Sequence, residues 1–246
     1  MSFVPRKALA MTEEALITCF HVSRAPVRQA LKELGDEGYE YIALPERLLA
    51  RKPASLGWNE SAGLPLAGLT AYQVLTRLGL KAGETVLIHG GAGGVGSLGI
   101  QIAVALGAKV IATASEKNHD FLRSLGAEPV SYGEGLAARV RALRPQGVDV
   151  VADFAGGNLD ATLAVLADGG RHASIADSDV EQHGGTWMWV NPVGAELQEL
   201  ADLVDEHGIR VEVARTFPLP QAADAFLLNM DGHTRGKIVV TVDDVA

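Results

Sequence analysis

A glycine-rich loop is the part of this sequence best suited to chemistry. Residues 89–96 read HGGAGGVG, in which Gly91, Gly93 and Gly96 give the spacing G-x-G-x-x-G. A β-forming run, TVLIH, precedes the loop, and an amphipathic helical pattern follows it over 94–106. In this context the glycines permit a tight turn, close approach of backbone N–H groups to a pyrophosphate, and close packing of helix on strand. The start of the helix favours such an anion, so we predict a dinucleotide-binding loop. A glycine-rich turn without a ligand is the alternative.

The end of the next predicted strand, KVIAT (109–113), bears on which dinucleotide fits. A site for NAD carries a carboxylate about 20 residues beyond the loop, where it accepts from the ribose 2′-hydroxyl. Here Ser115 and Lys117 offer a hydroxyl and an ammonium, which suit a 2′-phosphate, although Glu116 could face the ribose. We therefore predict NADP, the alternative for the lysine being a solvated position at a helix start. Tyr132 ends the third predicted strand and either borders this pocket or is a half-buried core tyrosine.

Strands and helices alternate from residue 85 onward, and they must position these residues. The pattern predicts strands at 85–89, 109–113, 128–132, 148–154, 169–176, 187–190, 209–214 and 237–242. It predicts helices at 61–79, 94–106, 117–125, 136–143, 158–167, 195–207 and 220–230. This order is typical of an α/β fold with a doubly wound parallel Rossmann sheet, which binds ligands at the carboxyl ends of its strands.

Composition excludes several classes of protein. Of the 246 residues, 48% are hydrophobic and 21% charged, as in globular proteins, and the net charge of −9 disfavours a whole-chain nucleic-acid binder. The single cysteine, Cys19, makes neither an intrachain disulfide nor a Cys-rich zinc site. No apolar run is long enough to span a bilayer, and the first residues lack a signal-peptide core. We expect a cytoplasmic protein without membrane contact.

Five stretches match a known family in order and spacing. They are LPLAGLTAYQVL, GETVLIHGGAGGVGSLGIQIAVALGAKVIATAS, VDVVADFAGG, LADGGRHASIA and HTRGKIVV. Residues 38–246 thereby resemble the C-terminal two thirds of a medium-chain dehydrogenase/reductase of the zinc-independent quinone oxidoreductase type. The resemblance implies NADPH-dependent hydride transfer to a small-molecule acceptor, a quinone or an enone. It also implies a homodimer, which the apolar edge strand WMWV (187–190) favours independently.

The resemblance also implies cofactor-binding residues. Gly93, Gly94, Val95 and Gly96 would lie against the pyrophosphate, and Thr70 would line the nicotinamide side. Together with Gly91, the cofactor-binding residues that we predict are Thr70, Gly93, Gly94, Val95, Gly96, Ser115, Lys117, Tyr132, Phe154, Ala155, Ser174 and Ile175. No acid/base dyad or nucleophile motif is evident, so we assign no catalytic residue; water can protonate the product. The scattered histidines His89, His172 and His233 support no metal site.

The chain departs from the family near its beginning. The pattern starts only near Gly38, where relatives have already passed most of a GroES-like domain. We therefore expect four parts: a helical segment (1–38), a remnant of the GroES-like domain with a linking helix (39–80), the Rossmann domain (81–215), and a C-terminal helix and return strand (216–246). With most of that domain absent, the return strand KIVVTV must pair with YEYIAL (39–44) or remain poorly covered.

Residues 12–39 resemble the helix-turn-helix of GntR-type regulators. In that reading Arg24, Arg28 and Gln29 would face DNA and Lys32 would lie near its backbone. The alternative is an amphipathic packing helix, which is favoured because the net charge of this segment is poor for a DNA anchor. Two alternative functions follow: an NADPH-binding regulator with a DNA-binding helix pair, and a catalytically dead remnant.

Overall fold

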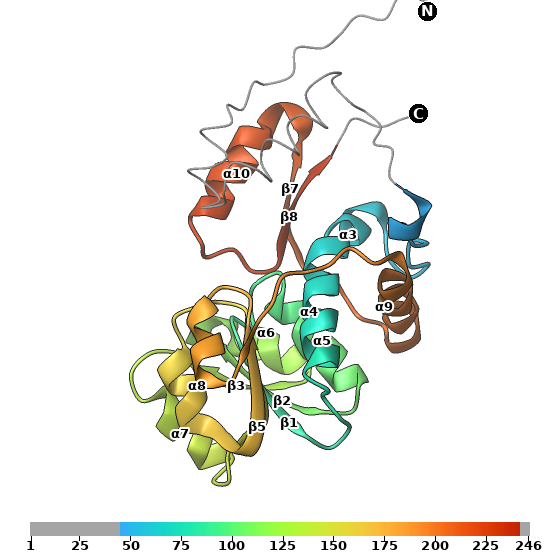
Figure 1. Ribbon diagram of the computed structural model, residues 1–246. Coiled ribbons are helices and arrows are strands. Elements are labelled where there is room, and N and C mark those ends of the chain that lie inside the picture. Colours follow the sequence, from blue (N-terminus) through green and yellow to red (C-terminus); the bar gives the residue numbers. More distant parts are fainter. Residues whose placement is uncertain (1–44, 242–246) are drawn as a thin grey trace, which may run out of the picture.

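A computed structural model describes residues 45–241 (Figure 1). The helix-turn-helix-like segment 12–39 and the YEYIAL segment lie outside the described residues. Within the described part, no helix is long and apolar enough to cross a membrane.

The main sheet has six parallel strands in the order β3-β2-β1-β4-β5-β6. The strands are β1 (Thr85–His89), β2 (Lys109–Ala114), β3 (Ala127–Ser131), β4 (Val148–Asp153), β5 (Leu166–Ser174) and β6 (Thr186–Trp187). This order confirms the predicted doubly wound sheet. The strand order reverses between β1 and β4, and a crevice opens at the carboxyl ends of strands at such a point.

Helices cover both faces of this sheet (Figure 1). One face carries α4 (Pro65–Arg77), α5 (Gly96–Ala105), α6 (His119–Ser124) and α9 (Gly194–His207), and the other carries α7 (Leu136–Leu143) and α8 (Leu159–Val165). Alternation along the strands explains the two cores, because Val86 and Ile88 of β1 pack on the first face and Leu87 on the second.

The remaining helical elements are short. They are η1 (Glu46–Leu48), α3 (Trp58–Ala62), η2 (Glu116–Asn118), η3 (Ser178–His183), η4 (Leu219–Gln221) and α10 (Ala222–Met230). The predicted helix 61–79 is thus divided, with a break before Pro65. A proline lacks the N–H that continues a helix, so Pro65 begins a new one.

A second, two-stranded sheet corrects two predictions. Its parallel strands are β7 (Val213–Pro218) and β8 (Lys237–Thr241), joined through α10. The strand predicted at 209–214 was misplaced, because Ile209 and Val211 are buried in the first core without forming a strand. The return strand pairs with β7 rather than staying uncovered. The WMWV strand was also wrong in extent, since β6 ends at Trp187.

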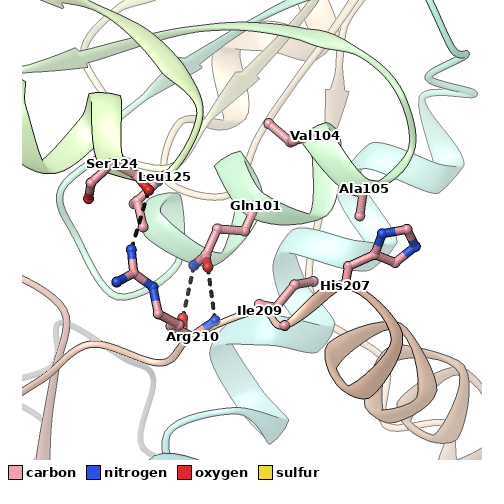
Figure 2. Close-up of a pocket in the computed structure, with 9 residues that line it drawn as sticks. Gln101, Val104, Ala105, Ser124, Leu125, His207, Ile209 and Arg210 are labelled. Carbon is pink, nitrogen blue, oxygen red and sulfur yellow. Dashed lines mark hydrogen bonds between the residues drawn. The ribbon is translucent and has the colours of Figure 1, made fainter.

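Two glutamines hold the flanks of α9. Gln73 of α4 is 1% exposed; its Nε2 donates to Asn191 O (2.7 Å) and its Oε1 accepts from Asn191 N (2.9 Å). Gln101 of α5 makes the same pair of bonds with the backbone of Arg210, at 2.8 and 2.9 Å (Figure 2). Each glutamine side chain thus bonds both the N–H and the C=O of one residue, as a neighbouring β-strand would. A buried polar group left without its partner costs about 1–3 kcal/mol. The part-buried bonds of Gln73 therefore help to fix the start of α9, and the more exposed bonds of Gln101 attach the segment that follows this helix.

Candidate functional site

The glycine loop connects β1 to α5 and is held from β2. The N–H of Gly91 donates to the carbonyl of Thr113 (2.9 Å), and the N–H of Gly90 donates to its hydroxyl (3.1 Å). The N–H of Gly93 turns back to the carbonyl of Gly90 (3.0 Å). The predicted loop is therefore a tight turn at the carboxyl edge of the sheet.

The glycines of the loop serve different purposes. A Cβ on Gly96 would lie 2.1 Å from the carbonyl oxygen of Gly90, and one on Gly91 would lie 2.9 Å from Cβ of Ala112. These two glycines are needed for the helix and strand to approach. A Cβ on Gly93 meets only the oxygen of Gly90, at 3.3 Å, and otherwise projects into open space. Packing within the fold therefore requires glycine less strictly at position 93 than at 91 or 96. A ligand lying against the backbone would be a further reason for glycine at this position.

The start of α5 offers free donors. No side chain caps the helix at Val95. Within residues 45–241, no acceptor takes the N–H of Val95 or that of Gly96. Unpaired N–H groups at a helix start attract an anion, and the helix dipole adds to this attraction.

Lys237 is a residue of this site that the sequence analysis did not identify. The N–H of Gly236 donates to the carbonyl of Ala92 (3.0 Å), which places the start of β8 on the loop. The Lys237 side chain follows and lies so close to Gly94 that a Cβ there would be 2.3 Å from its Cδ. Burial lowers the pKa of Lys237, and its ammonium has no carboxylate partner among the described residues. Lys237 belongs to the stretch HTRGKIVV, which matches the family in sequence, but only the fold brings this stretch to the loop.

The residues predicted for the 2′-phosphate gather at one edge. Ala114 and Ser131 are partners in the pairing of β2 with β3, so Ser115 and Tyr132 leave neighbouring strands together. Tyr132 is 58% exposed, which contradicts the half-buried core alternative. Lys117 is also exposed, in the turn after Ser115.

Several residues predicted near the nicotinamide have side chains that contact the protein itself. The hydroxyl of Ser174 donates to Asp153 (2.9 Å). Phe154 packs on α5, where a Cβ on Gly99 would lie 2.9 Å from its ring. The hydroxyl of Thr70 donates to the carbonyl one helical turn earlier, at 2.7 Å. Only the backbone at these positions can face a ligand, together with the exposed Ala155 and the partly buried Ile175.

His89 ends β1 directly beneath the loop. It is fully buried, its Nε2 lies 3.2 Å from Oγ1 of Thr162, and its Nδ1 has no partner in the part of the chain that the structure describes. Burial lowers its pKa from 6.5 to about 4, and the nearby negative charge of Asp153 acts in the opposite direction. The ring is therefore neutral at pH 7.

A hollow of about 480 Å³ lies elsewhere, along the C-terminal half of α5 (Figure 2). It is lined by Gln101, Val104, Ala105, Ser124, Leu125, His207, Gly208, Ile209 and Arg210. The amide of Gln101 bonds to the backbone of Arg210 and donates to the carbonyl of Ser97, and the guanidinium of Arg210 donates to the carbonyl of Ser124 (3.3 Å). These polar groups serve the fold, and the hollow does not reach the glycine loop. The described residues also contain no group of three or more His, Cys, Asp or Glu side chains that could hold a metal ion.

The low pKa of His89 predicts acid sensitivity. The unfolded chain, with the ordinary pKa, binds the proton more readily than the folded one. The free energy of unfolding should therefore fall as pH drops from about 6.5 to about 4, by about 3 kcal/mol, and this contribution should be absent above pH 6.5. Urea unfolding over this range measures it. His89→Gln should flatten the curve while His207→Gln, at an exposed position, should not; parallel curves for all three proteins would refute the assignment.

Comparisons with known proteins agree with this geometry. A family model described as zinc-binding dehydrogenase matches residues 125–240. The NADPH-dependent alkenal/one oxidoreductase of Arabidopsis thaliana is 37% identical over 206 residues, which are 82% of this chain and 52% of that protein. The chloroplast envelope quinone oxidoreductase homolog of the same plant is 30% identical over 237 residues, 85% of this chain and 70% of that protein.

Solved structures give the same result. A mycobacterial protein in complex with NADPH has a TM-score of 0.69 and 30% identity, over 78% of this chain and 66% of that one. This chain spans about half the length of the alkenal/one oxidoreductase. The glycine loop, the strand order and these similarities agree, and the chain belongs to the medium-chain dehydrogenase/reductase family.

Proposed function

We propose that this protein is an NADPH-dependent oxidoreductase that transfers hydride to a quinone or an enone. The observation that carries the proposal is the turn from β1 to α5, where the N–H groups of Val95 and Gly96 have no acceptor among the described residues and lie beside an uncovered Gly93. The alkenal/one oxidoreductase relative is NADPH-dependent by name, and the mycobacterial structure is an NADPH complex. The acceptor is proposed only as a class.

The residues at the loop fit a diphosphate. The backbone of residues 93–96 would bind it, and the absence of a Cβ on Gly93 leaves room for close approach. Lys237, partly buried and without a carboxylate partner in the described chain, would supply the balancing positive charge. Bound NADPH supplies the hydride, while the protein holds the dinucleotide and shields it from water.

NADPH is proposed over NADH because of the edge formed by β2 and β3. Ser115 and Lys117 follow β2, and the exposed Tyr132 follows β3, so a hydroxyl, an ammonium and an aromatic ring share this edge. The exposed Lys117 would pair with the 2′-phosphate, whereas no carboxylate ends β2 itself.

The cytoplasmic location expected from the sequence also stays a prediction.

Lys117→Ala should narrow the preference between the two nucleotides. We expect NADPH to bind more tightly than NADH, and the variant to weaken NADPH about tenfold, the scale of one charge-assisted bond at an exposed site, with NADH unchanged. Calorimetric titration measures both affinities. Lys109→Ala is the matched control, since Lys109 is an exposed lysine at the opposite end of the same strand. Equal affinities of the wild type for NADPH and NADH would rule out a 2′-phosphate site.

Turnover separates an enzyme from a binding protein. Purified protein should consume NADPH when a simple quinone or a simple enone is added. The loss of NADPH absorbance measures this consumption. Gly96→Val should abolish both binding and turnover, because even a Cβ at this position collides with the Gly90 carbonyl. Tight NADPH binding without turnover on either acceptor class would instead favour the sensor or remnant alternatives.

We also propose a homodimer through the outer edge of β6. This strand ends the six-stranded order, so within the described chain its outer edge has no partner. Trp187 and Trp189 are 37% and 65% exposed and form an edge-to-face pair at 5.5 Å. Exposed aromatic residues on an open edge favour pairing with another chain.

Sedimentation tests the proposed dimer. The wild type should sediment as a dimer, and Trp189→Lys should shift it toward monomer because a charge at this edge opposes pairing. Trp58→Lys, at an exposed tryptophan away from β6, is the control. A monomeric wild type would contradict the proposal.

A further inference from the structure

Asp153 is a buried carboxylate at the end of β4 that serves as a hub. It is 4% exposed, and its carboxylate accepts four hydrogen bonds from the described residues. Its Oδ1 accepts from the N–H of Ala155 (3.1 Å), the N–H of Gly156 (3.0 Å) and the side-chain amide of Asn158 (3.2 Å). Its Oδ2 accepts from the hydroxyl of Ser174 (2.9 Å). The carboxylate thus fixes the whole turn 154–158.

Ser174 extends the hub to a second loop. Its hydroxyl donates to Asp153 and accepts from the N–H groups of Ala176 and Asp177, both at 3.1 Å. The two loops also touch, since a Cβ on Gly156 would lie 3.1 Å from Cβ of Ala176. One carboxylate therefore sets the conformation of the loops that follow β4 and β5.

The burial of this charge is costly for a purely structural role. No cation pairs with Asp153 among residues 45–241, and its register partner His89 is a neutral ring at pH 7. A buried charge costs several kcal/mol unless hydrogen bonds compensate it, and apolar residues fill a core at least as well. What the carboxylate provides is an acceptor that fixes the orientation of four hydrogen-bond donors in the two loops.

The hub lies on one side of the glycine loop. A Cβ on Gly90 would lie 3.2 Å from Cβ of Ala155, so the turn after β4 contacts the loop. The predicted 2′-phosphate residues leave β2 and β3, on the other side of β1. A dinucleotide whose diphosphate lies on the glycine loop would extend along the carboxyl edge of the sheet, with its adenosine half over β2 and its other half over β4 and β5.

We propose that Asp153, acting through Ser174, is a positioning residue for the nicotinamide half of the dinucleotide. The proposal rests on the proposed function. Asp153 touches no ligand itself; it holds the backbone of residues 154–158 and 175–177 in the shape that receives that half.

Two ligands separate the halves of the site. NADPH uses both, whereas adenosine 2′,5′-bisphosphate carries only the adenosine half and one phosphate for the glycine loop, and lacks the half that would lie over β4 and β5. In Asp153→Asn the amide that replaces Oδ2 cannot accept from Ser174, and Ser174→Ala removes the link to the second loop. Calorimetry should give about tenfold weaker NADPH binding for each variant, the effect of one lost buried hydrogen bond, with unchanged binding of the bisphosphate.

A matched control lies on the same strand. Asp149 begins β4, and its carboxylate accepts from the N–H of Thr85 (2.8 Å) at the opposite edge of the sheet. Asp149→Asn should change neither affinity. If Asp153→Asn does not fold, Asn158→Ala removes only one of the four donors and should still weaken NADPH selectively.

The outcomes distinguish the two proposals. If the variants weaken both ligands equally, or weaken neither, Asp153 does not position the nicotinamide half and the inference is overturned while the proposed function stands. If the wild type binds neither ligand, the proposed function fails and the inference fails with it.

Discussion

The contact between the backbone of Gly96 and the carbonyl of Gly90 is the constraint on which the site depends. A Cβ at Gly96 would lie 2.1 Å from that oxygen, so the two segments meet only because a side chain is absent. This approach lets α5 begin directly behind β1 and leaves the N–H groups of Val95 and Gly96 at the edge of the sheet. Thr113 fixes the loop from β2. The candidate anion site is therefore made by backbone geometry and by the dipole of one helix.

A distant part of the chain completes this site. Gly236 bonds to the loop and has a φ of +77°, and a Cβ there would lie 2.2 Å from the carbonyl oxygen of Glu212, so this turn also requires glycine. The position of the turn depends on the pairing of β7 with β8, and β7 follows α9, whose flanks Gln73 and Gln101 hold. A series of packed elements thus connects α4 and α5 to the ammonium of Lys237.

The sequence predicts what local pattern determines and misses what packing determines. The doubly wound parallel sheet and the loop at Gly93 follow from alternation and glycine spacing, which are local signals. Ile209 and Val211 also alternate, but they fill the first core without a strand partner, so the pattern predicted a strand a few residues too early. Lys237 could not be located because its place depends on a strand pairing between distant residues. The bond from the Ser174 hydroxyl to Asp153 could not be predicted either, because it joins side chains from two different strands.

The proposed site must also bind a polyanion on a chain of net charge −9. Charges farther than about 8 Å are largely screened at physiological salt, so the local cations decide. Lys117 is exposed, and solvent weakens its attraction for a phosphate. Lys237 is partly buried, so its attraction is less weakened by solvent. In the proposed complex the two lysines therefore contribute differently. Lys237 and the start of α5 supply affinity for any dinucleotide, and Lys117 supplies the smaller increment that distinguishes a 2′-phosphate from a hydroxyl.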